Sequence, residues 1–355
     1  MSTQHIEFGL NSFGELIGDG TGRTGSPADS VRAIVEEAVL AEKVGIDIFS
    51  IGEHYRPEMV DSANHVILGT IAGRTESIRL GTSVTVLSTN DPVRIYAEAA
   101  TLQALSHGRA QLVVGRASAT ESFPLFGYDL ADYETLFEEK LDLLAQLMRN
   151  QPVTWSGSTR SSLTNQSVQP AIEPDSIPVW VGVGGSPQSV IRAARYRMPL
   201  MLAIVGGNPS RFAPFVDLYH RALQELGHAP LPIAEHSLGF FAATDEEARD
   251  TYWPLWKARM TDISRERGFR APTPENFYAE TQGGALFVGS PETMANRIAS
   301  TIRTLGLSRF DLKYDVVDMP PELRFQSIEL FGREVIPRVR ELLAKDEEAA
   351  GGTDH

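Results

Sequence analysis

Short apolar runs alternate along the chain with longer stretches in which apolar residues recur every three or four positions. The first pattern indicates buried β-strands, and the second indicates amphipathic helices. The runs predict strands at residues 6–13, 46–51, 78–87, 110–115, 178–183, 200–205, 233–243 and 310–317. The stripes predict helices at residues 27–44, 62–74, 92–105, 133–149, 187–196, 209–226, 246–260, 291–305 and 322–345.

This regular alternation implies parallel strands joined by right-handed crossovers. Eight such units fit a single (β/α)8 TIM barrel, in which insertions account for the length beyond the ~250 residues typical of the fold. The alternative is a doubly wound open sheet, split into two domains. Residues 152–177 are the nearest candidate for a linker, but they look more like a hairpin insertion. We therefore predict one barrel domain over residues 1–345 and a solvated tail over residues 346–355.

Composition and charge limit the classes of partner. The 355 residues include 46 acidic and 32 basic side chains, for a formal net charge of −14. This acidity argues against a nucleic-acid partner and against adhesion to anionic membranes. The chain has no cysteine, which excludes disulfides and thiolate catalysis.

Targeting and metal motifs are missing from the sequence. The first residues lack the pattern of a signal peptide, and no run approaches the roughly 18 apolar residues of a membrane span. A cytoplasmic protein without a membrane anchor is expected. His54 and His65 are too far apart for one helical face, and no other metal motif appears, so we expect no bound metal.

A glycine pattern at residues 20–25 matches G-x-G-x-x-G, the fingerprint of dinucleotide-binding turns, and Glu53 follows near the end of the second strand. Two details count against a nicotinamide site. Six residues separate Phe13 from the first glycine, whereas the true turn is tight, and Pro27 indicates a helix that starts only after the pattern. A polar loop at the barrel mouth explains the pattern better.

A second glycine cluster leads directly from a strand into a helix. Gly184 and Gly185 expose backbone N–H groups, Ser186 fits the N-cap, and Pro187 fits the first helical position. A helix N-terminus of this kind attracts phosphate, although an ordinary βα turn would explain the glycines equally well. Arg116, at the end of the neighbouring strand, calls for an anion. Together the arginine and the glycine turn suggest one phosphate site.

Two further strand ends carry candidate chemistry, because strand ends face the active site of a TIM barrel. His54 follows the second strand and has an unperturbed pKa near ~6.5, which suits a general acid or base. The alternative is a histidine satisfied by local hydrogen bonds. The third strand brings small and β-branched residues, including Ser83 and Val84, to the mouth. These suit a flat aromatic ring, although they are also simply good strand formers.

Several segments together resemble the bacterial luciferase-like family of flavin-dependent monooxygenases and oxidoreductases. The segments are residues 41–47 with 52–54, 80–87, 105–109, 178–187 and 287–292, and the helix that starts near Phe325. The match spans about residues 6–340 in the right order. One departure is the loop at residues 14–25, which is longer and richer in glycine than the family pattern and makes it unsafe to transfer a substrate by analogy.

The resemblance implies a TIM barrel that binds FMN at its C-terminal face. His54 falls on the family's catalytic histidine, and Ser83–Val84 falls on a non-prolyl cis peptide against the flavin ring. Phosphate-binding positions of the family fall on Arg116, Gly184, Gly185 and Ser186. The family's mobile loop falls between about residues 260 and 287, where prolines and glycines predict an irregular lid.

The resulting prediction is an FMN-dependent monooxygenase that uses reduced FMN and O2 on a small organic substrate. Because no nicotinamide site is evident, a separate NAD(P)H:flavin reductase is expected to supply the reduced FMN. Homodimers are common in the family, so a homodimer is expected here. Two alternatives stay open, which are a deazaflavin-dependent hydride-transfer oxidoreductase and a flavin-binding protein without catalytic activity.

Overall fold

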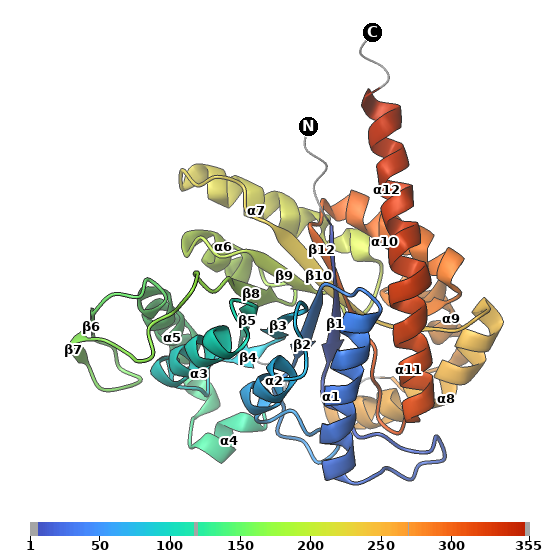
Figure 1. The fold of residues 1–355 in the computed structure, drawn as a ribbon, viewed down its shortest axis with the longest axis horizontal. Helices are drawn as coiled ribbons and strands as arrows, with labels where there is room; N and C mark the ends of the chain where they lie inside the picture. Colours follow the sequence, from blue (N-terminus) through green and yellow to red (C-terminus); the bar gives the residue numbers. More distant parts are fainter. Residues whose placement is uncertain (1–5, 117–119, 269, 352–355) are drawn as a thin grey trace.

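The computed structural model describes residues 6–116, 120–268 and 270–351. Within these ranges, eight parallel strands pair in a closed ring (Figure 1). The ring runs through β1 (Glu7–Ser12), β2 (Ile48–Ile51), β3 (Arg79–Thr82), β5 (Ala110–Gly115), β8 (Val179–Val183), β9 (Leu200–Ala203), β10 (Ile233–Phe241) and β12 (Arg309–Lys313). Pairing of β12 with β1 closes it. These are the eight predicted strands, so the TIM barrel prediction is confirmed and the open-sheet alternative is wrong.

Additional strands lie outside the ring. β6 (Val153–Trp155) and β7 (Leu163–Gln166) form an antiparallel pair, which confirms the hairpin insertion. The predicted third strand is split, because β4 (Thr85–Val86) pairs with β5 after an interruption at residues 83 and 84. β11 (Leu286–Gly289) pairs with the C-terminal half of β10 and was not predicted.

Helices cover the outside of the ring. The predicted helices correspond to α1 (Pro27–Lys43), α2 (Asn64–Ala72), α3 (Pro92–Leu105), α5 (Tyr133–Leu147), α6 (Pro187–Arg195), α7 (Ala213–Glu225), α8 (Asp245–Arg267), α10 (Pro291–Leu305), α11 (Pro321–Leu330) and α12 (Ile336–Gly351). Their starts follow from local sequence. Ser26, Asp91 and Ser290 each accept a hydrogen bond from a backbone N–H of the first turn, and a proline follows each of them.

In three segments the secondary structure differs from the prediction. The segment assigned to an irregular lid is largely helical, since α8 extends to Arg267 and α9 covers Pro274–Gly283. Its prolines and glycines mark helix ends: Gly268 adopts φ +69° as the cap of α8, and Pro274 opens α9. The last predicted helix is interrupted by a π-helical turn at Phe331–Val335. α12 then continues to Gly351, into the segment assigned to the tail.

Short helical elements occur in the connections between ring strands and the helices that follow them. α4 (Ser122–Phe126) and a 3₁₀ turn (Leu130–Asp132) follow β5, and a second 3₁₀ turn (Pro209–Phe212) precedes α7. In Figure 1, α4 and α8 lie on the lower side, whereas α12 ends on the upper side. Because α4 follows β5 and α8 follows β10, the C-terminal ends of the strands face the lower side. We call this end of the barrel the mouth.

The barrel interior combines an apolar layer with a buried ion pair. Val113, Trp180, Met201 and Ala234 form an interior cluster. Arg309, which is in register with Ala234, donates two hydrogen bonds to Asp311, and both side chains are fully buried. The interior is thus filled by side chains, as in other TIM barrels, and leaves the mouth as the place for a ligand.

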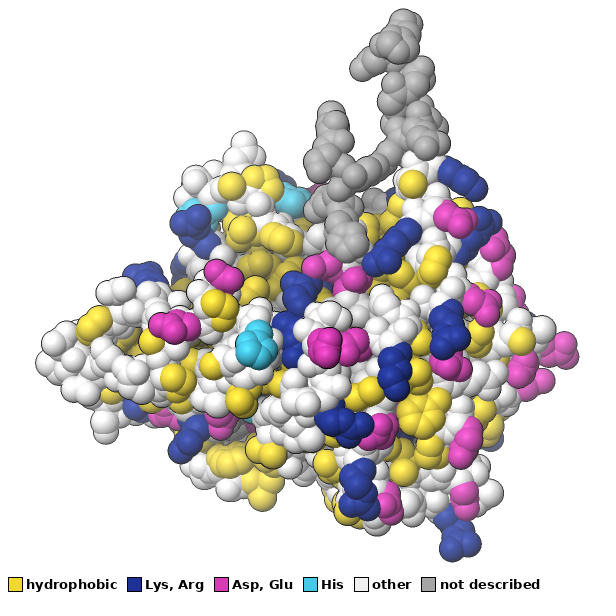
Figure 2. All heavy atoms as spheres, viewed as in Figure 1, with side chains coloured by type: hydrophobic (Ala, Val, Ile, Leu, Met, Phe, Trp, Pro, Cys, Tyr) yellow, Lys and Arg dark blue, Asp and Glu magenta, His cyan; other side chains and the backbone are white. Residues whose placement is uncertain are grey.

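The surface carries charges of both signs. On the face shown in Figure 2, acidic and basic side chains are interspersed between apolar ones. Among the described residues, no helix is both long enough and apolar enough to span a bilayer.

Candidate active site

His54 lies just beyond the end of β2, at the mouth. Its Nδ1 is 2.7 Å from Oδ2 of Asp61, and its backbone N–H donates to Oδ1 of the same carboxylate over 3.1 Å. Asp61 is fully buried, whereas the imidazole keeps 16% of its surface exposed. The carboxylate therefore holds the ring through Nδ1 and leaves the opposite edge free for a ligand.

Two loops meet to place Asp61 under the histidine. Residues 14–16 pair with residues 58–60 through an antiparallel bridge between Glu15 and Met59. Gly14 adopts φ +66°, and a Cβ at this position would lie 2.7 Å from the Cβ of Asp61. Only glycine combines this backbone angle with such a close approach.

The electrostatics of the pair favour a protonated imidazole. Burial alone would lower the pKa of His54, but the hydrogen bond to Asp61 and the carboxylate charge raise this pKa above its usual value. Burial raises the pKa of Asp61 to about 6, against the opposing effect of His54. At neutral pH the carboxylate is ionised, so His54 holds its proton more tightly than a free histidine, as a proton-transfer residue near neutral pH requires.

Ser83 and Val84 join β3 to β4, and the peptide bond between them is cis, as the family resemblance implies. Ser83 Oγ accepts a hydrogen bond from Nδ2 of Asn11 over 2.7 Å, and the same nitrogen lies 2.8 Å from Nδ1 of His236. Val84 packs against Gly115, where a Cβ would lie 2.8 Å from its side chain. Ser83 is therefore held by its hydrogen bond to Asn11, and Val84 is held by its contact with the backbone at Gly115.

Phe13 connects the two histidines of the mouth. Its ring centroid is 4.9 Å from that of His54 and 5.6 Å from that of His236. The ammonium of Lys313 lies 5.1 Å from the same ring and is itself paired with Glu15 over 2.6 Å. The side chain next to His54 is therefore an aromatic ring, and the charges of Lys313 and Glu15 are paired with each other.

Arg116 reaches the first turn of α6, as the phosphate prediction requires. Its Nη2 donates to Oγ of Ser189 over 2.9 Å, and its Nη1 binds the carboxylate of Glu134. The guanidinium also lies over the ring of Tyr133, 5.3 Å from its centroid. Residues 117–119 fall outside the described part of the chain.

The glycine turn lies at the same helix end. Ser186 is the N-cap residue of α6, although its side chain bonds Gln188 and leaves the backbone N–H groups uncapped. Gly185 adopts φ +111°, and a Cβ on Gly184 would meet no atom within 4 Å. Open space, uncapped N–H groups and an arginine together fit a phosphate, with Glu134 as the group it would displace from Arg116.

The buried carboxylate of Glu53 connects segments of the mouth through hydrogen bonds. Its carboxylate accepts from the backbone N–H of Val86 over 2.8 Å, and from Asn90 and the hydroxyl of Tyr55. Burial raises the pKa of Glu53, and these donors oppose the rise. Its oxygens are thus occupied, so it cannot act as the ribose partner of a dinucleotide site.

The glycine pattern at residues 20–25 is a loop pinned to the turn after β12. The backbone N–H of Gly20 donates to the carbonyl of Asp318, and that of Gly22 donates to its carboxylate over 2.6 Å. The N–H of Gly25 donates to the carbonyl of Ile17. Because these N–H groups are used within the protein, the pattern does not form a phosphate cradle, and the dinucleotide interpretation is wrong.

The C-terminal part of α8 is tied to the mouth by ion pairs. Arg259 lies 2.7 Å from Glu58 and 3.2 Å from Glu15, and Arg56 binds Glu266 through two hydrogen bonds. These contacts place the segment predicted as a lid beside the loops that carry His54 and Asp61.

Sequence reasoning missed several residues of the mouth, namely Asn11, Phe13, Asp61, Glu134, Ser189 and His236. A detectable signal existed for two of them, since Asn11 and Phe13 alternate on the first strand and so share one face. Asp61 lies in an irregular loop, and its approach to His54 depends on pairing between two loops. No local sequence pattern predicts such a contact.

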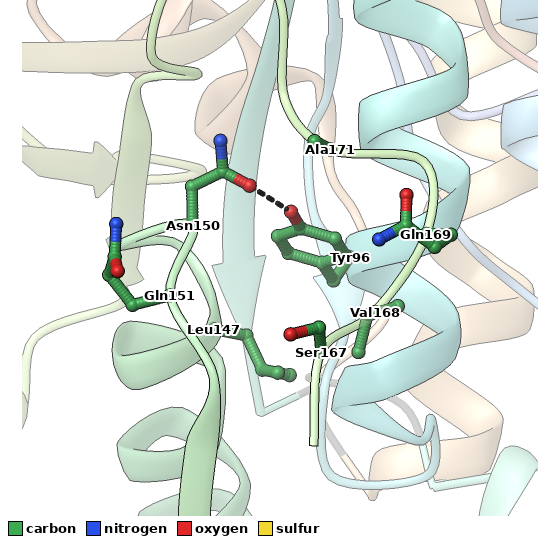
Figure 3. Close-up of a pocket in the computed structure, with 8 residues that line it drawn as sticks. All are labelled: Tyr96, Leu147, Asn150, Gln151, Ser167, Val168, Gln169 and Ala171. Carbon is green, nitrogen blue, oxygen red and sulfur yellow. Dashed lines mark hydrogen bonds between the residues drawn. The ribbon is translucent and has the colours of Figure 1, made fainter. Parts of the chain in front are cut away.

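Two hollows lie outside this cluster. A cavity of about 130 Å³ opens where the chain returns from the β6–β7 hairpin, between α3 and α5 (Figure 3). There the hydroxyl of Tyr96 donates to Oδ1 of Asn150 over 2.8 Å. A wider hollow of about 480 Å³ lies along residues 123–130, on α4 and the turn that follows. Neither is lined by His54, Arg116 or the glycine turn.

Comparison with known proteins gives the family. The family model for luciferase-like monooxygenases matches residues 7–309, so the chain belongs to the luciferase-like monooxygenase family. It is similar to the N-acetyl-S-alkylcysteine monooxygenase of Bacillus subtilis, at 30% identity over 247 residues, which cover 66% of this chain and 67% of the relative.

Solved structures agree on the fold. The oxygenating constituent of 3,6-diketocamphane monooxygenase from Pseudomonas putida, solved with FMN, superposes with a TM-score of 0.73 at 19% identity, covering 94% of this chain and 99% of the other. An F420-dependent secondary alcohol dehydrogenase, solved with an F420–acetone adduct, gives 0.72 at 20% identity, covering 95% and 99%. The same barrel is therefore found in proteins that bind either kind of cofactor.

Proposed function

We propose that the protein is a flavin-dependent monooxygenase that uses reduced FMN and O2 to oxygenate a small organic substrate. The proposal rests on family membership together with the layout of the mouth, where a proton-holding histidine and a phosphate-binding helix end occur on one face of the barrel. The observation that carries it is the contact between Arg116 and Ser189, which brings a guanidinium to the open N-terminus of α6.

Each group of residues has a distinct task in this proposal. Arg116, Gly184, Gly185 and Ser186 bind the phosphate, and Ser83 and Val84 support the ring of the cofactor. Reduced FMN supplies the electrons that activate O2. His54 donates or accepts a proton at Nε2, the nitrogen opposite its bond to Asp61, while Asp61 keeps the imidazole oriented. The aromatic wall at Phe13 excludes water from the ring edge of His54.

The first test is a fluorescence titration of the purified protein with FMN and with a deazaflavin. Binding of FMN supports the proposal, whereas tight binding of the deazaflavin without any binding of FMN, oxidised or reduced, contradicts it. The second test supplies reduced FMN and O2 and measures substrate oxygenation. His54→Ala should lose most turnover, and full turnover in this variant would refute the role of His54.

Two alternatives give different results in the same assays. A deazaflavin-dependent hydride-transfer enzyme has support from the F420-dependent dehydrogenase of the same fold. It would bind the deazaflavin and would consume no O2. A flavin-binding protein without catalytic activity would bind FMN and release peroxide rapidly with every substrate tried.

The source of reduced FMN and the assembly are part of the proposal. Because the glycine pattern at residues 20–25 is occupied by internal hydrogen bonds, a separate NAD(P)H:flavin reductase is the expected supplier. We also expect a cytoplasmic homodimer. Turnover with NAD(P)H and FMN should therefore require an added reductase, and the molar mass in solution should be twice that of the chain.

A further inference from the structure

A second histidine, His236, projects into the barrel next to the mouth. It lies on β10, where it is paired in register with Ala203 of β9 and Asp311 of β12. Its side chain contacts Asn11, which lies on β1, and Phe13, which directly follows β1. Only 6% of the residue is exposed. None of the proposed catalytic steps uses this imidazole.

Hydrogen bonding determines which ring nitrogen of His236 carries the proton. Nδ2 of Asn11 lies 2.8 Å from Nδ1 of His236 and 2.7 Å from Oγ of Ser83. An amide nitrogen has two hydrogens and no acceptor capacity, so it donates to both partners. In this orientation of the Asn11 amide, whose Oδ1 is buried and has no partner among the described residues, Nδ1 accepts, and the proton of the neutral ring lies on Nε2.

Nε2 of His236 has no hydrogen-bond partner among the described residues, and it is not one of their buried unpartnered atoms. It follows that this nitrogen keeps some exposed surface. Both neighbouring polar side chains, Asn11 and Ser83, are fully or almost fully buried, so the ring is held in one orientation. A fixed N–H donor thus faces the space where a ligand would bind.

Burial and most of the surrounding charges favour the neutral form of His236. Burial is the main effect and lowers its pKa to about 4. Asp311 opposes this fall, whereas Lys313, Arg309 and His54 reinforce it. The remaining contacts, from Asn11, Phe13 and Ala203, carry no charge.

His54 and His236 therefore differ in protonation although both contact Phe13. The neighbouring carboxylate of Asp61 favours the charged form of His54, whereas among the described residues His236 has no carboxylate within hydrogen-bond distance. Two titratable groups whose surroundings separate their protonation states usually divide the work of a site between them. One can transfer a proton, and the other can only donate a hydrogen bond.

We propose that His236 is a further ligand-contacting residue of the mouth, whose Nε2–H donates a hydrogen bond to an uncharged carbonyl oxygen of the bound molecule. An uncharged donor suits a neutral acceptor, because it places no charge in the apolar interior. The carbonyl can belong to the flavin ring or to an organic substrate. The inference rests on the proposed function only for the place where the ligand binds.

The test without ligand is the ¹⁵N NMR spectrum of the histidine side chains between pH 5 and 8. We expect His236 to be the Nε2–H tautomer throughout, while His54 is protonated over part of this range. An Nδ1–H tautomer of His236, or its titration near pH 6.5, would overturn the inference. This result is obtained whether or not the protein binds FMN.

The test with ligand uses two probes, oxidised FMN and cyclohexanone, each added to the labelled protein. A shift of the His236 Nε2 resonance with FMN assigns the carbonyl to the flavin, and a shift with cyclohexanone alone assigns it to the substrate. If neither probe moves the resonance, the inference is wrong. If fluorescence shows no FMN binding while cyclohexanone moves it, the proposed function fails and the inference stands.

Variants connect the contact to function. His236→Gln keeps an N–H donor, so its affinity for the probe that moved the resonance should stay within about threefold of the wild-type affinity. His236→Phe removes the donor and should weaken this affinity about tenfold, as expected for the loss of one hydrogen bond. His65→Gln is the matched control, because His65 is a half-buried histidine on α2 whose partner is Glu98 of α3. Equal affinities of the Gln and Phe variants at position 236 would overturn the inference.

Discussion

Replacing Asp61 with asparagine isolates the electrostatic part of the contact with His54. The substitution keeps the shape of the side chain and an oxygen near Nδ1 but removes the charge. In the wild type, the carboxylate lies 2.7 Å from Nδ1 and is fully buried, so solvent screens it little. Burial, which lowers the pKa of His54, would then be opposed mainly by the more distant Glu121 and Glu15.

The size of the effect follows from the kind of bond that is lost. A hydrogen bond to a charged group contributes about 1.5–3 kcal/mol, and one pKa unit corresponds to about 1.4 kcal/mol. We therefore expect the pKa of His54 to fall by about 1 to 2 units in Asp61→Asn. A raised histidine pKa stabilises the fold below the unfolded pKa, and this contribution is lost as the pH rises through the folded pKa. The variant should therefore lose stability at acidic pH, and this loss should shrink as the pH rises through the folded pKa of His54.

The assay is the pH titration of the His54 ring resonances by NMR, with His236 and His65 as internal references. A matching shift to lower pH should appear in the pH–rate profile of turnover, provided that His54 transfers a proton during the reaction. An unchanged or higher pKa of His54 in Asp61→Asn would refute the electrostatic account of the pair.

Three further predictions follow from other contacts. Glu134→Gln should tighten FMN binding by up to about fivefold, measured by fluorescence titration, because Arg116 loses a competing carboxylate; weaker binding would mean that Glu134 instead positions the arginine. Gly14→Ala should lower the free energy of unfolding by about 1–3 kcal/mol in denaturant titrations, because φ is +66° and Asp61 fills the space; unchanged stability would contradict this close approach. Glu235 is fully buried, and burial raises its pKa to about 8, so the folded chain retains a proton that the unfolded chain loses near pH 4.5. Unfolding free energy should thus fall by up to about 1.4 kcal/mol per pH unit between these values, and Glu235→Gln should remove that slope; parallel pH profiles of wild type and variant would rule this out.

The sequence was sufficient for the barrel because each ring strand is a short apolar run between turn residues. It was also sufficient to place His54 and Arg116, since both follow a strand and strand ends converge in this fold. The cis peptide between Ser83 and Val84 followed only from the family resemblance, and the split of the third strand at these residues was not predicted. For the ring strands, His54 and Arg116, the information is local to one strand and its end.

What could not be predicted depends on contacts between distant segments. Asp61 approaches His54 because the loops after β1 and β2 pair with each other, and Glu134 reaches Arg116 from α5. The prolines and glycines of residues 260–287 were interpreted as irregular backbone, but several of them cap α8 and α9. Proline and glycine occur both in irregular loops and at helix ends, and only the hydrogen bonds around them distinguish the two cases.

The central claim is that the mouth binds a flavin through its phosphate, at Arg116 and the start of α6. The most direct measurement compares the affinities of FMN and riboflavin, which differ only in the phosphate, for the wild type and for Arg116→Gln. The account predicts that the wild type prefers FMN by at least about tenfold, as one lost charged contact requires, and that the variant largely loses this preference. Equal affinities for the two flavins in the wild type, or an undiminished preference in Arg116→Gln, would contradict it.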